Sequence, residues 1–156
     1  MIDLHTSSSQ EVFDYILDGI RKQGGPSIKS DGLSSACMYR GDNGRKCAVG
    51  LCIPDELYIP SMEGLTLEEL WDDKEEINEN LHAGIHKHTP LLCALQNAHD
   101  YSFKQASQEI DFLSLFENAC ENTAILFYLQ YKAPRHVDLP AICYHLRFPP
   151  RRKLRG

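Results

Sequence analysis

Three side chains of the sequence could form a nucleophilic centre. Cys47 offers a thiol, and His99 with Asp100 offers a base and a carboxylate. A cysteine nucleophile needs a base within hydrogen-bond reach and a third group that orients this base. Adjacency in the chain does not direct the carboxylate to the second ring nitrogen, and we expect Cys47 to be a buried, unreactive thiol in a strand. The sequence therefore favours a protein without catalytic activity over an enzyme.

Two further patterns could bind small ligands. Tyr39 and Arg40 could hold an anion, because a guanidinium pairs with phosphate or carboxylate, so an enzyme using Arg40, Cys47 and His99 on a small molecule or nucleotide is an alternative. His82 and His86 have the spacing that puts two imidazoles on one helix face. No carboxylate or cysteine completes a recognisable ligand set with them, so we predict no metal and no cofactor. If zinc were bound, His82, His86 and Cys93 would be the first candidates.

A run of acidic residues is the most pronounced charge feature. Ten acids and one base lie between residues 55 and 79. Such runs are commonly solvated helix faces, but they can also resemble nucleic-acid phosphates and occupy a basic groove of another protein. The apolar side of this surface is expected to be buried through Leu67, Leu70, Trp71, Ile77 and Leu81. The predicted partner-binding acids are Glu68, Glu69, Asp72, Asp73, Glu75, Glu76 and Glu79.

The charge changes sign towards the C-terminus. Residues 1–131 carry 9 basic and 21 acidic side chains, whereas residues 132–156 carry 7 basic and one acidic. Arg151, Arg152, Lys153 and Arg155 form a basic tail over residues 149–156 that could hold nucleic acid. A few charges on such a tail give weak, non-specific affinity, and the acidic body repels nucleic acid. A host protein with a basic surface is therefore the favoured partner, and nucleic acid is the alternative.

A β-hairpin is the element expected to position these residues. Asn43-Gly44 tolerates the positive φ angles of a type I′ turn, so we predict strands at 36–40 and 45–51. In such a hairpin Cys37 and Cys47 would point to opposite faces, unless the loop had three or five residues.

The predicted helices surround this hairpin. The first spans residues 9–23, with a capping box at Ser8 and Glu11 and a glycine cap at Gly24. Thr66 and Glu69 form a second capping box, Thr89-Pro90 starts another helix that ends at Asp100-Tyr101-Ser102, and a further helix covers 104–124.

These elements predict an α+β protein with an N-terminal helix and an antiparallel hairpin at about 36–51 covered by several helices. We expect one domain over 1–125, an extra strand or extension at 126–148, and the tail. No segment reads as a membrane span or a signal peptide, so the protein is expected in the cytoplasm, with its six cysteines reduced.

The chain also resembles a group of uncharacterised small bacteriophage and prophage proteins over residues 10–122. The resemblance rests on Cys37-x-Tyr39-Arg40-Gly41, Gly44-x-Lys46-Cys47-Ala48-Val49-Gly50, Ile53-Pro54-Asp55-Glu56-Leu57-Tyr58, Met62-Glu63-Gly64 and Leu92-x-x-Leu95-Gln96-x-x-His99-Asp100. It implies a phage or mobile-element origin and carries no activity. With the acidic surface, it favours a non-enzymatic inhibitor of a host protein, such as an anti-CRISPR-type inhibitor of a nucleic-acid-handling defence complex.

Overall fold

A computed structural model describes residues 1–30, 35–72 and 79–134. Over these residues the chain is α+β, as predicted, with five α-helices and a two-stranded antiparallel sheet. The elements in chain order are α1 (Ser9–Gln23), β1 (Ile28–Ser30), β2 (Ser35–Cys37), η1 (Asp42–Gly44), α2 (Ala48–Cys52), η2 (Asp55–Leu57), η3 (Pro60–Met62), α3 (Leu67–Asp72), α4 (Glu79–Gln105) and α5 (Phe112–Leu126).

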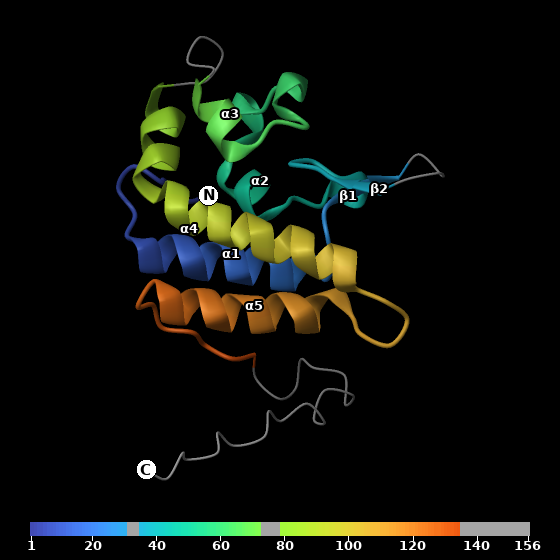
Figure 1. The fold of residues 1–156 in the computed structure, drawn as a ribbon. Coiled ribbons are helices and arrows are strands. Elements are labelled where there is room, and N and C mark those ends of the chain that lie inside the picture. Colours follow the sequence, from blue (N-terminus) through green and yellow to red (C-terminus); the bar gives the residue numbers. More distant parts are fainter. Residues whose placement is uncertain (31–34, 73–78, 135–156) are drawn as a thin grey trace, which may run out of the picture.

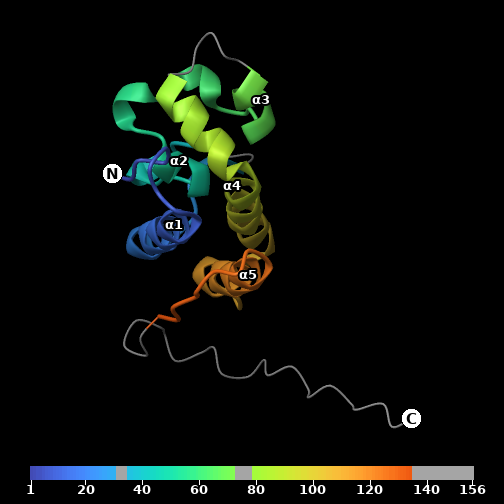
Figure 2. The ribbon, with the colours of Figure 1, turned by 90° about the vertical axis from the view of Figure 1, so that its left-hand side faces the viewer.

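The long helix α4 organises the fold, because it contacts α1, α2, α3 and α5. Figure 1 shows α3 beside the N-terminal part of α4, with α1 and α5 beside its C-terminal part, and Figure 2 shows the same order from the side. The β1–β2 sheet projects from one side of this helical body. Within the described residues, no helix is long and apolar enough to cross a membrane.

Helix α1 has the predicted bounds and caps. The Ser8 amide donates to Glu11 Oε2 at 2.7 Å, and the Glu11 amide donates back to Ser8 Oγ at 3.3 Å. At the other end Gly24 adopts φ 68°, which glycine reaches without steric cost. Val12, Phe13, Ile16, Leu17 and Ile20 are all buried along one face. Local sequence signals and the buried face agree here, and the prediction is confirmed.

The predicted helix start at Thr89-Pro90 is wrong, because α4 runs from Glu79 to Gln105 without a break. Thr89 Oγ1 donates to the Ile85 carbonyl, and Pro90 is exposed, so its ring is accommodated on the solvent side. One buried stripe continues past the proline and also passes the predicted end at residues 100–102. It comprises Leu81, Ile85, His88, Leu92, Leu95, His99 and Ser102, at alternating spacings of four and three residues.

An antiparallel pair of strands forms, but it joins residues 28–30 to 35–37 instead of 36–40 to 45–51. β1 pairs with β2, with Ile28 opposite Cys37 and Ser30 opposite Ser35. The Asn43-Gly44 turn does form, with φ of 60° and 71°, but it joins only an isolated bridge between Arg40 and Lys46. The predicted second strand at 45–51 is therefore wrong, and residues 48–52 form helix α2 instead.

The burial of α2 does not fit the half-exposed strand of the predicted hairpin. Ala48, Val49, Gly50 and Cys52 are all buried, whereas a strand with one solvent face would alternate. Helix α2 packs against both α1 and α4. Its N-cap is Cys47, whose sulfur accepts from the Gly50 amide at 3.3 Å. Because residues 48–52 are helical, the prediction that Cys37 and Cys47 point to opposite faces of one hairpin no longer applies.

The last described residues return to the helical body. Helix α5 begins eight residues later than predicted, after the N-cap Asp111. Beyond it, Gln10 exchanges hydrogen bonds with the backbone of Gln130 at 2.9 and 2.7 Å. Residues 127–134 form no strand, and the rest of the predicted 126–148 strand lies outside the described residues, as does the basic tail.

Candidate functional site

The Arg40 side chain acts as a structural clamp, because it binds backbone carbonyls at the end of α2. Its Nη1 donates to the carbonyls of Gly50 at 2.6 Å and Tyr39 at 3.2 Å, and its Nη2 donates to the Ile53 carbonyl at 2.7 Å. The contacts with Gly50 and Ile53 satisfy carbonyls at the C-terminal end of α2, where a cation also complements the helix dipole. The same Nη2 pairs with Asp55 Oδ1 at 3.0 Å. The guanidinium is therefore engaged by the protein itself, which argues against the alternative that Tyr39 and Arg40 bind an anion.

Glu63 completes this clamp, and its role was missed by the sequence reasoning. Its two carboxylate oxygens accept from the backbone amides of Tyr39 at 2.9 Å and Arg40 at 2.8 Å. The Tyr58 hydroxyl donates to the same carboxylate at 2.9 Å, and the Tyr58 ring lies 4.8 Å from the Arg40 guanidinium. Glu63 thus satisfies two adjacent backbone amides that lie outside the β1–β2 pairing.

Other motif residues add contacts around Arg40 and Glu63. Lys46 Nζ contacts Asp55 Oδ1 at 2.6 Å, and the Tyr39 hydroxyl donates to the Leu65 carbonyl at 2.8 Å. One network therefore joins the segment after β2, the end of α2 and the loop before α3; its motif residues are Tyr39, Arg40, Lys46, Asp55 and Tyr58.

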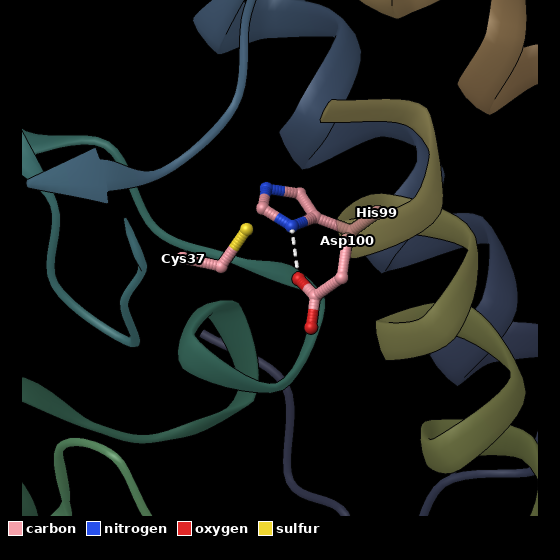
Figure 3. Close-up of side chains that lie close together, drawn as sticks. All are labelled: Cys37, His99 and Asp100. Carbon is pink, nitrogen blue, oxygen red and sulfur yellow. Dashed lines mark hydrogen bonds and ion pairs between the residues drawn. The ribbon is translucent and has the colours of Figure 1, made fainter. Parts of the chain in front are cut away.

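A second cluster joins β2 to α4. Figure 3 shows Cys37 of β2 directed at His99 and Asp100 of α4. His99 Nδ1 lies 2.9 Å from Asp100 Oδ1, and Gln96 Nε2 donates to the same oxygen at 2.9 Å. The expectation that adjacent His99 and Asp100 would not pair is therefore wrong. The partner that orients the ring is distant in sequence: the Ser27 amide donates to His99 Nε2 at 3.1 Å.

This geometry fixes the protonation of His99. Nε2 accepts a hydrogen from the Ser27 amide, so the ring proton lies on Nδ1 and is donated to Asp100. The imidazole is fully buried and neutral, with both nitrogens occupied. It has no lone pair left to accept a proton from a thiol. A catalytic unit of cysteine, His99 and Asp100 is not assembled in this arrangement.

The thiols are correspondingly unreactive. Burial raises the pKa of Cys47 to about 12, although the Gly50 amide contact acts in the opposite direction. Burial and the neighbouring Asp100 carboxylate raise the pKa of Cys37 to about 12. A nucleophilic cysteine needs the opposite shift, towards the thiolate at neutral pH. Cys47 is a helix cap rather than a nucleophile.

Asp100 is the ionised member of the cluster. Burial alone would raise its pKa, but hydrogen bonds from His99, Gln96 and Cys37 outweigh burial and leave the pKa below its usual value. His99 contacts Asp100 through a hydrogen bond and, being neutral, does not balance its charge, and the Asp100 side chain is 32% exposed. A half-buried negative charge without a cationic partner among the described residues therefore remains at this point.

Cys37, His99 and Asp100 are also the described residues whose potential metal-ligand atoms converge, within 4.8 Å of one another. Cysteine, histidine and aspartate are suitable zinc ligands. Coordination at Nδ1 would move the ring proton to Nε2, where it would face the Ser27 amide hydrogen, so a metal would disrupt a buried hydrogen bond. The sequence candidates His82, His86 and Cys93 do not form this group, and Cys93 instead contacts Glu68.

A cavity of about 330 Å³ opens beside the second cluster. Cys37 and Cys47 both line it, which contradicts their predicted placement on opposite faces. Leu65 and Leu67 contribute apolar wall, and residues 96, 97 and 100 of α4 contribute amides and a carboxylate. This cavity is not predicted from the sequence, although the motif segments 62–64 and 92–100 contribute several of its lining residues.

The acidic surface is described in part. Glu68 and Glu69 of α3 and Glu79 of α4 are exposed, while Leu67, Leu70 and Leu81 are buried, as predicted for an outward acidic face. The capping box predicted at Thr66 and Glu69 is confirmed. Nothing is described of the side chains of Trp71 and Asp72, and Asp73, Glu75, Glu76 and Ile77 lie outside the described residues.

Comparison of the chain with protein families, with curated proteins and with solved structures finds no match.

Proposed function

We propose that the protein is a non-enzymatic inhibitor that binds a basic surface of a host protein through the acidic face of α3 and the start of α4. The observation that carries this proposal is the separation of charge from apolar surface on α3. Glu68 and Glu69 are exposed on one side, and Leu67 and Leu70 are buried on the other. Because the leucines anchor the helix to the body, the carboxylates are held outward on a folded element.

The chemistry of the motif supports a binding protein rather than an enzyme. Arg40 is engaged by backbone carbonyls, His99 has both nitrogens occupied, and Cys47 is a buried cap with a raised pKa. These are the three residues that an enzyme centred on the predicted hairpin would have used.

The phage-like motif favours a phage-encoded protein acting in the cytoplasm of the host cell. A carboxylate surface resembles the phosphates of nucleic acid, so the proposed target is a host protein whose basic groove handles nucleic acid. An anti-CRISPR-type inhibitor of a defence complex is the concrete form of this proposal.

The test is capture of host proteins by the full chain, followed by competition of the captured protein with its nucleic acid. Charge reversal at Glu68 and Glu79 is expected to weaken capture, and added salt is expected to weaken it further. Glu121→Lys on α5 is the matched control, because Glu121 is an exposed glutamate away from α3. Equal effects of Glu79→Lys and Glu121→Lys would contradict the proposal.

Truncation of residues 149–156 separates the acidic face from the basic tail. If the acidic face binds the partner, removal of Arg151, Arg152, Lys153 and Arg155 leaves capture intact. If truncation abolishes capture, or if the captured species is nucleic acid, the alternative of a nucleic-acid-binding accessory protein replaces the proposal.

A further inference from the structure

The described charged side chains that line the cavity beside the Cys37, His99 and Asp100 cluster are all acidic. Among the described residues, its lining contains the carboxyl side chains of Glu63, Glu68 and Asp100, and no lysine, arginine or histidine side chain. Lys104 lies one turn beyond Asp100 on α4 and is not part of the lining. The cavity is therefore suited to a positively charged group.

Asp100 provides the fixed charge of this cavity. Its Oδ1 accepts from His99 and Gln96, and Gln96 is held in turn because its Oε1 accepts the Val49 amide at 3.2 Å. Figure 3 shows the second carboxylate oxygen directed away from the imidazole. The neutral, doubly hydrogen-bonded His99 positions the carboxylate without neutralising it, so the charge is preorganised for an incoming cation.

The walls of the cavity match the stem of a basic side chain. Leu65, Leu67 and Met38 line the cavity together with the Asn97 amide and the Asp100 carboxylate. Lysine and arginine carry an apolar stem and a charged tip, and they bury the stem along apolar surface. A small metal ion would use the carboxylate but not the apolar walls.

The cavity is continuous with the acidic face of α3. Glu68 belongs to both, because it is exposed on α3 and also lines the cavity. A basic surface that docks on Glu68, Glu69 and Glu79 would therefore bring its side chains to the cavity opening.

The geometry points to a recognition pocket for one lysine or arginine side chain of the basic protein partner, with Asp100 receiving the ammonium or guanidinium group and Leu65 and Leu67 packing on the stem. This inference rests on the proposed function, since it names how the partner of the acidic face is recognised.

Titration of the isotope-labelled full chain with Nα-acetyl-arginine methylamide tests the pocket directly. The amide resonances of Leu65, Gln96 and Asn97 are expected to shift. The citrulline analogue, which has nearly the same shape but no charge, is expected to leave them unchanged. Asp100→Asn is expected to weaken binding of the arginine probe about tenfold or more, because a charge-assisted hydrogen bond is lost.

A second variant keeps the test decisive if Asp100→Asn disturbs the fold. Asn97 is exposed on α4 and lines the cavity, so Asn97→Trp is expected to fill the opening and abolish the shifts. Glu121→Gln is the control that leaves probe binding unchanged. Equal binding of arginine and citrulline probes, or unchanged binding to Asn97→Trp, would overturn the inference.

The outcomes also separate this inference from the proposed function. If Glu79→Lys weakens capture of the partner while Asn97→Trp does not, the acidic face binds and the pocket inference fails. If Glu79→Lys leaves capture unchanged, the proposed function fails, whatever the probes do. Stoichiometric binding of Zn²⁺ alone, lost in Cys37→Ser, together with no shift from the arginine probe, would replace the pocket inference by a metal site.

Discussion

Replacement of Arg40 by methionine is expected to destabilise the protein strongly. Methionine keeps an apolar stem of similar length and removes the guanidinium. The two short hydrogen bonds lost are those to the carbonyls of Gly50 at 2.6 Å and Ile53 at 2.7 Å. Each charge-assisted bond contributes about 1.5–3 kcal/mol to stability. The Arg40 side chain is 17% exposed, so water can replace part of these contacts. We therefore expect the free energy of unfolding to fall by about 3 kcal/mol.

For a chain of this size, each kcal/mol lowers the melting temperature by roughly 2–4 °C, so Arg40→Met should melt roughly 6–12 °C below the wild type. Differential scanning calorimetry and urea denaturation measure this directly. Asp55→Asn is the matched comparison, since it removes the ion pair but leaves the carbonyl contacts. The Asp55 side chain is 70% exposed, and exposed ion pairs contribute little, so its effect should be far smaller.

The ratio of these two effects tests the reasoning. If Arg40→Met melts at the same temperature as Asp55→Asn, the carbonyl contacts do not carry the stability that we assign to them, and Arg40 would again be available for a ligand. A normal far-ultraviolet circular dichroism spectrum at low temperature confirms that both variants are compared as folded proteins.

Three further outcomes are expected. Gly50→Ala should destabilise by about 3 kcal/mol or more in urea denaturation, because its Cβ would lie 2.2 Å from the Tyr39 carbonyl oxygen, whereas Gly19→Ala meets only a flexible leucine side chain. Equal losses would refute this. Tyr128→Gly should stabilise the protein by about 0.5–1 kcal/mol, because the tyrosine holds φ 55° directly after Phe127, the C-cap of α5; a lower denaturation midpoint would contradict it. The pKa of Asp100 is depressed in the folded protein, so its carboxylate stabilises the fold above the ordinary aspartate pKa of about 3.9. This stabilisation is lost as the pH falls through the lower folded pKa. Asp100→Asn should therefore flatten the acid limb of a plot of unfolding free energy against pH.

Several elements could be predicted from the sequence because their signals are local. The two capping boxes use side chains three residues from the amides that they satisfy, and Gly24 and Asn43-Gly44 adopt positive φ as predicted. The buried face of α1 follows from the spacing of its apolar residues. In each case the interacting groups lie within about one helical turn, so the chain needs no distant partner to define them.

The errors concern elements whose alternatives are decided by distant contacts. Residues 45–51 resemble a strand, but burial between α1 and α4 and a hydrogen bond from the Val49 amide to Gln96 make residues 48–52 a helix. Pro90 is a helix-start signal, but the buried stripe on both sides of it and its exposed position let α4 continue. The alternating stripe itself was readable in the sequence and would have corrected this prediction.

The sequence by itself determined the α+β class, the first helix with both caps, the tight turn at Asn43-Gly44 and the acidic, outward face of α3. The tertiary structure alone decided the pairing of β1 with β2, the state of His99 and the lining of the cavity. Ser27, Cys37 and His99 are separated by up to 72 residues, and no local pattern specifies that the Ser27 amide meets His99 Nε2. Such contacts arise when helices bury their apolar faces together, and the polar groups carried into the core must then find partners there.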